Sequence, residues 1–374
     1  MITIAWKNLF HDRVRLTVTL VGIVFALVLI LVQFGLFLGF LDTSSNIVAE
    51  SHVDLWITAP SIPHVNGGSP LHESLRYRAL GVAGVKAVEK YTLMFVNWKL
   101  PSGAQQSIQV VGFPLGAGMG GPWNLTAGSV EALRGEDTVM IDELYKEKLG
   151  VGRIGDTVEI TGRRARVVGF TRGIRSFTTI PYVFTSFKNS QDYARLAENQ
   201  TTFFLVRTAP GADVQAVKAA LSDKLETVDV YTNEELRRKT RNYWVFGTGA
   251  GITTLMGAIL GLIVGVVVVA QTIYSATVDH IREFGTLKAM GASNRHIYTV
   301  ILAQAALSAA LGYGVAVSIA LAAARLSVAG NAPIEVPAPV AVGAFALALS
   351  MCAGASMISI RKATRIDPAM VFRG

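Results

Sequence analysis

The chain has 374 residues, of which 51% are hydrophobic and only 16% are charged. Soluble domains carry about 25% charged residues, so this composition excludes an ordinary soluble protein and predicts segments that lie in lipid. The net charge of +8 comes without zinc-finger spacing or an RNA-binding aromatic motif, so no nucleic-acid partner is expected. The single cysteine, Cys352, excludes an intrachain disulfide and a cysteine-based metal site.

Four apolar runs are long enough to cross a bilayer, which takes roughly 20 residues in a helix. They cover residues 16–41, 246–276, 298–324 and 340–360, and none of them contains Asp, Glu, Lys or Arg. The first run is longer than the apolar core of a signal peptide, so we expect it to remain as an anchor. The pattern predicts an α-helical membrane protein with four transmembrane helices.

Basic residues outnumber acidic ones at both chain ends and between the second and third runs. The basic residues are Lys7, Arg13, Arg15, Arg282, Lys288, Arg295, Arg361, Lys362, Arg365 and Arg373. The positive-inside rule therefore predicts that both termini are cytoplasmic in a bacterial inner membrane. Residues 1–15 become a cytoplasmic amphipathic segment, residues 361–374 a cytoplasmic tail, and residues 325–339 a short outer loop.

Residues 42–245 form one large extracytoplasmic insertion between the first and second spans. Alternating apolar residues predict strands, and helical patterns occur between some of them, so we expect an α+β domain. The expected strands are 53–58, 94–100, 107–113, 138–141, 157–161, 165–171, 182–185 and 203–208. The expected helices are 74–79, 142–149, 190–199 and 212–225.

The end of this domain reads as a helical stalk that starts near Asn233 and continues into the second span. Asn233 is the expected N-cap. A hinge at Gly247, Gly249 and Gly251 is the competing interpretation. A basic cluster on the stalk can contact lipid headgroups or an anionic ligand, or form a solvated helix face. The cluster consists of Arg237, Arg238, Lys239 and Arg241.

The second span carries a glycine row, Gly257, Gly261 and Gly265. Small residues four apart let another helix approach closely. The row can serve packing within the chain or a dimer face, and the spacing leaves both open.

Residues 277–297 lie between the second and third spans and are charged at both ends. Ile281, Phe284, Leu287 and Met290 recur every three residues, and Gly291 follows as a C-terminal stop. The pattern indicates a short amphipathic helix, although a solvated connecting loop fits it equally well. We refer to residues 277–297 as the coupling segment.

Motifs for chemistry are missing from the chain. Gly116, Gly118 and Gly121 match G-x-G-x-x-G by count, but Pro122 and Trp123 follow where a helix would have to open. There is no phosphate loop of the form G-x-x-x-x-G-K-[ST], no H-E-x-x-H and no G-x-S-x-G. We therefore expect no enzyme activity, no metal site and no cofactor in this chain.

Three segments resemble those of the FtsX/MacB-like permeases of ABC transporters, the type VII or mechanotransmission class. They are the entry segment AWKNLFHDRVRLTVTLVGI, the central IREFGTLKAMGASNRHI and the tail RKATRIDPAMVFRG. In the inserted domain, HVDLWITAP and FVNWK look closest to the DevC branch. The resemblance covers the whole chain, and its strength lies in the joint order of motifs and spans.

The resemblance implies that two permeases pair with two copies of a separate ATPase, which binds ATP and Mg²⁺. The chain begins only a few residues before its first span, so the ATPase is expected on another chain. The central segment would dock on it as a coupling helix. The residues expected to couple are Arg282, Glu283, Phe284, Gly285, Leu287, Lys288, Gly291, Ala292 and Ser293.

The family's functions give two main expectations and exclude a third. The first is export or extraction of an amphiphilic substrate, lipid-like, glycolipid or a hydrophobic small molecule, with a periplasmic membrane fusion protein, an outer-membrane duct and membrane lipids as partners. The alternative is a non-transporting regulator that activates an extracytoplasmic hydrolase. A sensor receptor would need a cytoplasmic output domain, for which the tail of residues 361–374 leaves no room.

Overall fold

The computed structural model describes residues 13–279, 286, 288, 290–327 and 333–364. The chain divides into two compact units, which we call the helical unit and the sheet unit. The helical unit comprises Met1–Gly39, Ile252–Val328 and Ala332–Gly374. The sheet unit comprises Phe40–Gly251 and Ala329–Asn331.

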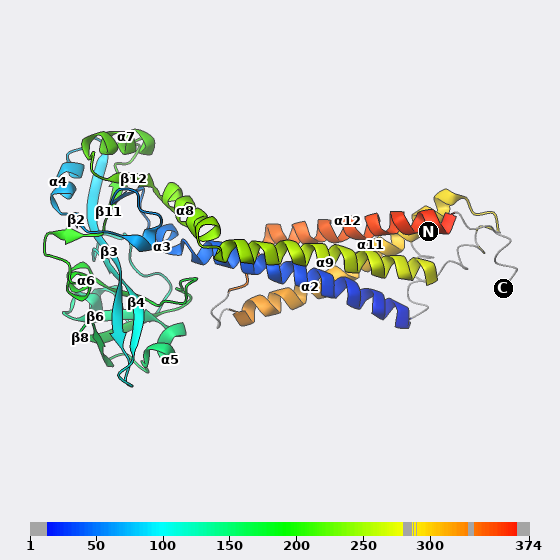
Figure 1. Ribbon diagram of the computed structural model, residues 1–374, viewed down its shortest axis with the longest axis horizontal. Coiled ribbons are helices and arrows are strands. Elements are labelled where there is room, and N and C mark those ends of the chain that lie inside the picture. The colour runs from blue at the N-terminus through cyan, green and yellow to red at the C-terminus, as the bar shows by residue number, and fades with distance from the viewer. Residues whose placement is uncertain (1–12, 280–285, 287, 289, 328–332, 365–374) are drawn as a thin grey trace. The chain divides into compact units, whose positions relative to one another are not determined.

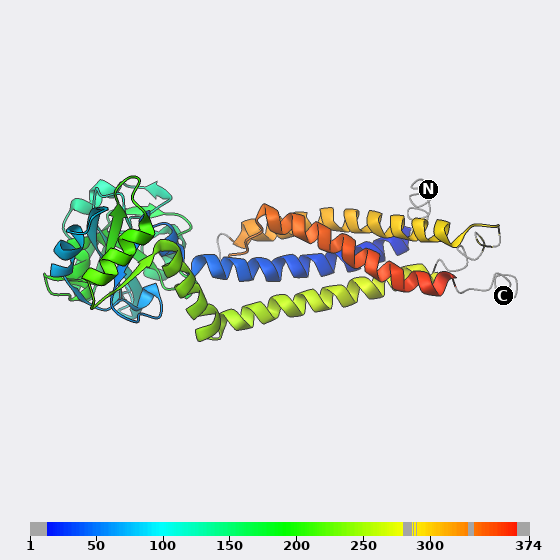
Figure 2. The same ribbon diagram turned by 90° about the horizontal axis from the view of Figure 1, so that it is seen from above.

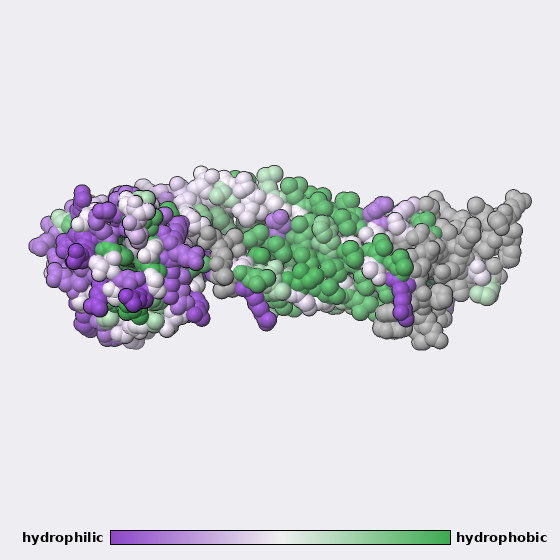
Figure 3. All heavy atoms as spheres, turned by 90° about the horizontal axis from the view of Figure 1, so that it is seen from below, coloured by the Kyte–Doolittle hydropathy of each residue, from purple (hydrophilic) through white to green (hydrophobic). Residues whose placement is uncertain are grey.

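Four long helices build the helical unit and lie side by side in both ribbon views (Figures 1 and 2). They are α2 (Arg13–Thr43), α9 (Ala250–Asp279), α11 (Asn294–Ser327) and α12 (Ala338–Thr364). Each is long and apolar enough to cross a membrane. Hydrophobic side chains cover their visible surface in Figure 3. This confirms the prediction of a four-helix membrane protein.

Helix α2 packs against each of the other three helices. Its residues Ile23 and Leu27 are fully buried in one cluster with Val269 of α9, Ala309 of α11 and Cys352 of α12. Small residues allow this close packing, because apolar helices in lipid associate through contact rather than through the hydrophobic effect.

The sheet unit is built on a ten-stranded mixed sheet, which confirms the α+β prediction. The strand order is β12-β1-β11-β3-β4-β9-β6-β8-β5, with β7 paired to both β3 and β8, while β10 and β2 form a separate pair. The strands are β1 (Leu55–Thr58), β2 (Leu71–His72), β3 (Val85–Lys99), β4 (Gln105–Phe113), β5 (Leu125–Ala127), β6 (Thr138–Asp142), β7 (Thr157–Ile160), β8 (Arg163–Thr171), β9 (Tyr182–Ser186), β10 (Gln200–Thr201), β11 (Phe203–Thr208) and β12 (Asp229–Thr232).

Helices and helical turns of the sheet unit occupy the connections between strands. They are α3 (Asn46–Ala49), η1 (Val65–Gly67), α4 (Ser74–Leu80), η2 (Val130–Arg134), η3 (Glu143–Tyr145), α5 (Lys146–Leu149), α6 (Phe187–Ala194), α7 (Val214–Lys224), α8 (Asn233–Asn242) and the π-helical turn η4 (Tyr243–Gly247). Helix α7 shows how the sequence sets such an element. Asp213 caps it by accepting from the Gln215 amide, and Val217 and Leu221, four residues apart, bury one face.

Strand β3 joins two hydrophobic cores because its two halves have different partners. The first half pairs with β11 and the second half with β4. In the larger core the Trp56 ring meets the Tyr91 and Phe203 rings edge-on at 5.4 and 5.7 Å. In the smaller core Trp98 is fully buried, and its Nε1 donates to the Leu149 carbonyl at 3.0 Å. Both cores are therefore anchored on one strand.

One helix of this unit begins and ends earlier than the sequence pattern predicts. The helix expected at 190–199 is α6, Phe187–Ala194. Ser186 caps it through the Asn189 amide, and Arg195 ends it in the left-handed region with φ of 53°. The prediction was wrong at the start because Ser186 caps the helix four residues before the predicted start, and at the end because the pattern gives no sign of the left-handed Arg195.

Candidate functional site

The coupling segment is described only at its C-terminal end. Arg282, Glu283, Phe284, Gly285 and Leu287 lie outside the described residues. At positions 286 and 288 the chain is helical, and the Met290 amide donates to the Thr286 carbonyl at 3.0 Å, which is the bond of an α-helix.

Gly291 ends this helical turn and Ser293 begins the next helix. The Gly291 amide donates to the Lys288 carbonyl at 3.0 Å, and its φ of +92° is the left-handed conformation that favours glycine. The Ser293 hydroxyl accepts from the amide of His296, the third residue of α11, at 3.3 Å. Ser293 is thus an N-cap for α11. Gly291, Ala292 and Ser293 therefore form a compact helix-to-helix corner.

One large apolar side chain is exposed at this corner. Met290 is 72% exposed, whereas Ile297 is fully buried beside Val300 and Ile301. The buried residues fix the start of α11 within the helical unit, and the exposed methionine presents a flexible apolar side chain. The exposed Met290 is a candidate contact for another protein surface.

A second candidate site is the junction that ends the sheet unit, residues 243–250, which we call the hinge. Helix α8 ends at Asn242, the chain then makes the π-helical turn η4, and α9 starts only at Ala250. Gly249 between them has φ of +75°. The predicted continuous stalk is therefore wrong, because a left-handed residue breaks the helix. π-Helical turns occur frequently at functional sites.

Aromatic rings surround the hinge. The Trp244 ring lies 4.4 Å from the Phe177 ring and 4.9 Å from the His64 ring, and His64 lies 4.4 Å from the Tyr243 ring. Burial lowers the pKa of His64, so the imidazole remains neutral near pH 7. Nothing in the residue pattern around His64 predicts its place beside the hinge. The signal lay in the aromatic pair Tyr243-Trp244 directly before the second span.

The basic cluster before the hinge binds mainly to its own domain. The Arg241 Nε donates to the Leu41 carbonyl at 3.1 Å and to the Ser45 hydroxyl at 2.9 Å. Lys239 donates to the Tyr231 hydroxyl at 2.9 Å, and Arg237 pairs with Glu234 at 3.4 Å. Only Arg238 of the four is exposed without a contact among the described residues. The cluster thus ties α8 to the end of α2.

The cap of α8 is Thr232, and the expectation that Asn233 caps it was wrong. The Thr232 hydroxyl accepts from the Glu235 amide at 3.2 Å, and the Glu235 carboxylate accepts from the Thr232 amide at 2.8 Å. This reciprocal pair is a capping box. The Asn233 side chain instead donates to the Val48 carbonyl at 2.8 Å, which adds a tie between α8 and α3.

The glycine row of α9 faces α2 of the same chain. A Cβ atom at Gly265 would lie 2.7 Å from Ile30 Cδ1, and one at Gly261 would lie 3.3 Å from Gln33 Cγ. At Gly257 the nearest atom is Gln33 Oε1 at 3.3 Å. The row is a packing face within the chain, and α2 leaves no room at these glycines for a helix of a second copy.

The glycine-rich loop at residues 116–121 has a structural role. The Arg207 guanidinium donates to the backbone oxygens of Gly118 at 2.9 Å, His52 at 3.1 Å and Ala117 at 3.4 Å. Strand β5 follows the loop, and no helix opens at Pro122 in this described stretch. The arrangement lacks the helix N-terminus on which a dinucleotide site depends.

Nearly the whole chain matches known protein families. Residues 16–224 match the MacB-like periplasmic core domain, and residues 238–368 match the FtsX-like permease C-terminal domain. An uncharacterised ABC transporter permease of Mycobacterium tuberculosis strain CDC 1551 / Oshkosh is 25% identical over 388 residues, covering 100% of both chains. Its counterpart in strain H37Rv matches equally.

Two solved structures resemble the sheet unit at low similarity. The periplasmic region of MacB from Actinobacillus actinomycetemcomitans has a TM-score of 0.38 and 13% identity, covering 53% of this chain and 96% of that one. The extracellular domain of YknZ from Gram-positive bacteria has a TM-score of 0.36 and 16% identity, covering 48% and 98%. Because these TM-scores are low, the family of the chain is assigned from the family matches alone.

Four apolar helices with a large α+β domain between the first and second define a multi-pass protein of the inner membrane. More particularly, the chain belongs to the FtsX/MacB-like family and is an ABC transporter permease of that type. The comparisons do not single out the DevC branch, which stays a prediction.

Proposed function

We propose that this permease transmits the movement of a separate ATPase to its own sheet unit, and that this movement drives export or extraction of an amphiphilic substrate. ATP and Mg²⁺ would bind to the partner and not to this chain. The observation that carries the proposal is the helix-to-helix corner at Gly291 and Ser293. It holds an exposed apolar residue, Met290, at the start of a long transmembrane helix.

The corner suits force transmission because α11 starts there as a capped helix whose first turn buries Ile297. Ser293 caps α11 and Ile297 is fully buried, so a push on the corner moves the start of α11 as a body. Motion of α9 would reach the sheet unit through the hinge, where Gly249 permits a change of direction. The ties made by Arg241 and Asn233 hold α8 to α2 and α3, so bending concentrates at residues 243–250.

A second copy of the chain and membrane lipids are further proposed partners. Helix α9 has only 22% of its apolar window buried, against 33% for each of the other three helices. Its exposed residues include Met256, Ile259, Ile263 and Val267. This face supports contact with a second copy or with lipid. The membrane fusion protein and the outer-membrane duct stay predictions from the family resemblance.

We propose further that the corner and both termini are cytoplasmic, and a reporter cysteine tests this. In a Cys352→Ala background, Met290→Cys should resist an impermeant thiol reagent in intact cells and react after permeabilisation. Ser102→Cys, in an exposed turn of the sheet unit, should react in both conditions. Labelling of Met290→Cys in intact cells would reverse the orientation.

Gly249→Ala tests the hinge. Alanine lacks a comfortable conformation at φ of +75°, so the variant should lose about 1 kcal/mol of stability. Because it also favours a continuous helix, it should reduce the stimulation of the partner ATPase by substrate. ATPase rates in reconstituted vesicles measure this.

Gly211→Ala is the matched control for the hinge. Gly211 has φ of +81° and, like Gly249, no atom within 4 Å of an added Cβ. It should lose similar stability while leaving the ATPase rates unchanged. Equal ATPase effects in both variants would refute a hinge at Gly249.

A further inference from the structure

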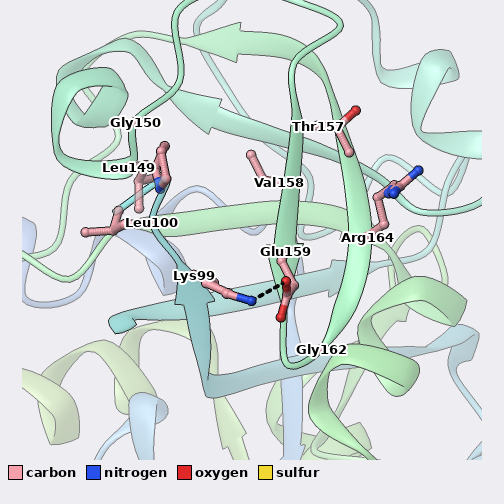
Figure 4. A pocket seen from close by; sticks show the side chains of 10 residues that line it. Lys99, Leu100, Leu149, Gly150, Thr157, Val158, Glu159, Gly162 and Arg164 are labelled. Atoms are coloured by element: carbon pink, nitrogen blue, oxygen red, sulfur yellow. Dashed lines mark hydrogen bonds and ion pairs between the residues drawn. The ribbon is translucent and has the colours of Figure 1, made fainter. Parts of the chain in front are cut away.

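A groove of about 550 Å³ lies at one end of the sheet unit (Figure 4). It runs along β7 and is bounded by the end of β3 and by the C-terminal end of α5. The half-buried Leu100 supplies an apolar wall, the fully buried Leu149 lies behind it, and Lys99 and Glu159 point toward one another with an ion pair of 2.9 Å. The groove lies outside both sites described above.

The groove follows an open edge of the sheet. Strand β3 pairs with β7 only through Trp98↔Ile160 and Lys99↔Glu159, and it turns away at Pro101. The Val167 amide of β8 donates to the carbonyl of Asp156, so the backbone of Asp156 points toward β8. In an antiparallel pair every second residue points its N–H and C=O toward the same neighbouring strand, so the backbone groups of Val158 also point toward β8. The N–H and C=O of Thr157 therefore face the groove, where β3 no longer supplies a partner.

The charge beside this edge is positive. Arg164 lines the groove opposite Glu159 on the neighbouring strand, and Arg166 follows two residues later on the same face of β8. Glu159 is already paired with Lys99. Within the described part of the chain, neither Arg164 nor Arg166 has an ion-pair or hydrogen-bond partner for its guanidinium. Two cations are thus left for a ligand.

We propose that this groove binds an extended acidic segment of another protein chain, which adds to β7 as a strand. The open backbone groups of Thr157 would pair with the segment's backbone, as in other strand-addition complexes. Arg164 and Arg166 would pair with its carboxylates, and Leu100 would contact one of its alternate apolar side chains. Uncovered strand edges are normally shielded by charge or covered, and this one is bordered by cations that repel a second copy of itself.

The probe is a fluorescent, end-blocked octapeptide of alternating valine and glutamate, titrated against the purified full-length chain in detergent. Anisotropy should show saturable binding. Arg164→Glu should weaken binding by about tenfold or more, because it reverses one of the charges that pair with the peptide. A peptide with lysine in place of glutamate should not bind.

Lys86→Glu provides the matched protein control. Lys86 is exposed at the other end of β3, roughly 43 Å along the strand from Lys99, and the substitution makes the same change in charge. It should leave the affinity unchanged. Equal weakening by Lys86→Glu and Arg164→Glu would show attraction to overall charge and overturn the proposal.

N-methylation of the peptide tests strand addition on the unaltered protein. Methyl groups on alternate backbone nitrogens remove donors without changing charge, so affinity should fall by about tenfold. An undiminished affinity would mean that the groove selects any flexible polyanion, a phosphorylated glycan included. Absence of saturable binding by the unmethylated peptide would also overturn the proposal.

Discussion

Replacing Glu283 by lysine should reduce the stimulated ATPase rate of the assembled complex to the basal rate of the ATPase alone. Glu283 lies on the family's motif within the coupling segment, and reversing a charge at a docked interface costs about 2–5 kcal/mol. Every 1.4 kcal/mol is about a tenfold loss of affinity, so the ATPase should dissociate at working concentrations. Copurification of the ATPase and its rate in vesicles are the measurements.

Glu226→Lys is the control for this variant. Glu226 is exposed in the sheet unit, has no ion pair in the described chain, and undergoes the same change of charge. It should leave association and stimulation intact. Glu283→Lys should keep the sheet unit folded, which far-ultraviolet circular dichroism of the purified chain can check. If Glu283→Lys retains full stimulation, the coupling segment does not dock where we propose.

Gly265→Leu should destabilise the helical unit by about 1–3 kcal/mol. A single Cβ at this position would already lie 2.7 Å from Ile30 Cδ1, so the further atoms of leucine must separate α9 from α2. Overpacking of a close interface costs about this much. The midpoint of thermal unfolding in detergent should fall by several degrees relative to the unaltered protein.

Gly314→Leu distinguishes packing within the chain from a dimer face. Gly314 lies on α11 with no atom within 4 Å of an added Cβ, so leucine there should leave the unfolding midpoint unchanged or raise it. The oligomeric state of both variants should match that of the unaltered protein. A dimer that dissociates in Gly265→Leu while the monomer keeps its unfolding midpoint would assign the glycine row to the dimer contact.

The four spans were predictable because lipid imposes a simple rule on sequence. Every segment in the bilayer must satisfy its backbone as a helix and avoid charge, so uninterrupted apolar runs mark the spans. The exact helix boundaries were less predictable than the spans themselves. Phe246 is apolar enough to belong to the second span, yet α9 begins only at Ala250 because Gly249 is left-handed. The residue pattern of 243–247 contains no sign of a π-helical turn.

In the sheet unit, the sequence predicted strands where apolar and polar residues alternate strongly, but it predicted only the second half of β3. The sequence marked residues 94–100, whereas β3 begins at Val85. Its first half carries Lys86, Glu89 and Lys90, which read as solvated, and its pairing with β11 is a contact between distant parts of the chain. Such long-range pairing decides the strand and leaves no local mark.

In the candidate sites, too, features set by neighbouring residues were predictable and features set by distant segments were not. Gly291 as a helix stop was readable from its neighbours, and the structure gives it φ of +92°. The aromatic packing of His64 on Trp244, and the open edge of β7, depend on segments that are far apart in the chain. The direction of the glycine row toward α2 could not be derived either, because spacing alone does not say which helix approaches.

The pairing of β1 with β12 has a consequence for how such proteins can diversify. β1 follows α2 after α3, β12 precedes α8, and the two strands are antiparallel neighbours, with Leu55 opposite Thr232. The entry and exit of the whole insertion thus meet within a strand spacing, about 5 Å. A domain whose ends meet can be enlarged, exchanged or grafted between helix hairpins without altering the bundle that carries it. One membrane scaffold can therefore acquire new binding specificities by replacement of a single inserted domain.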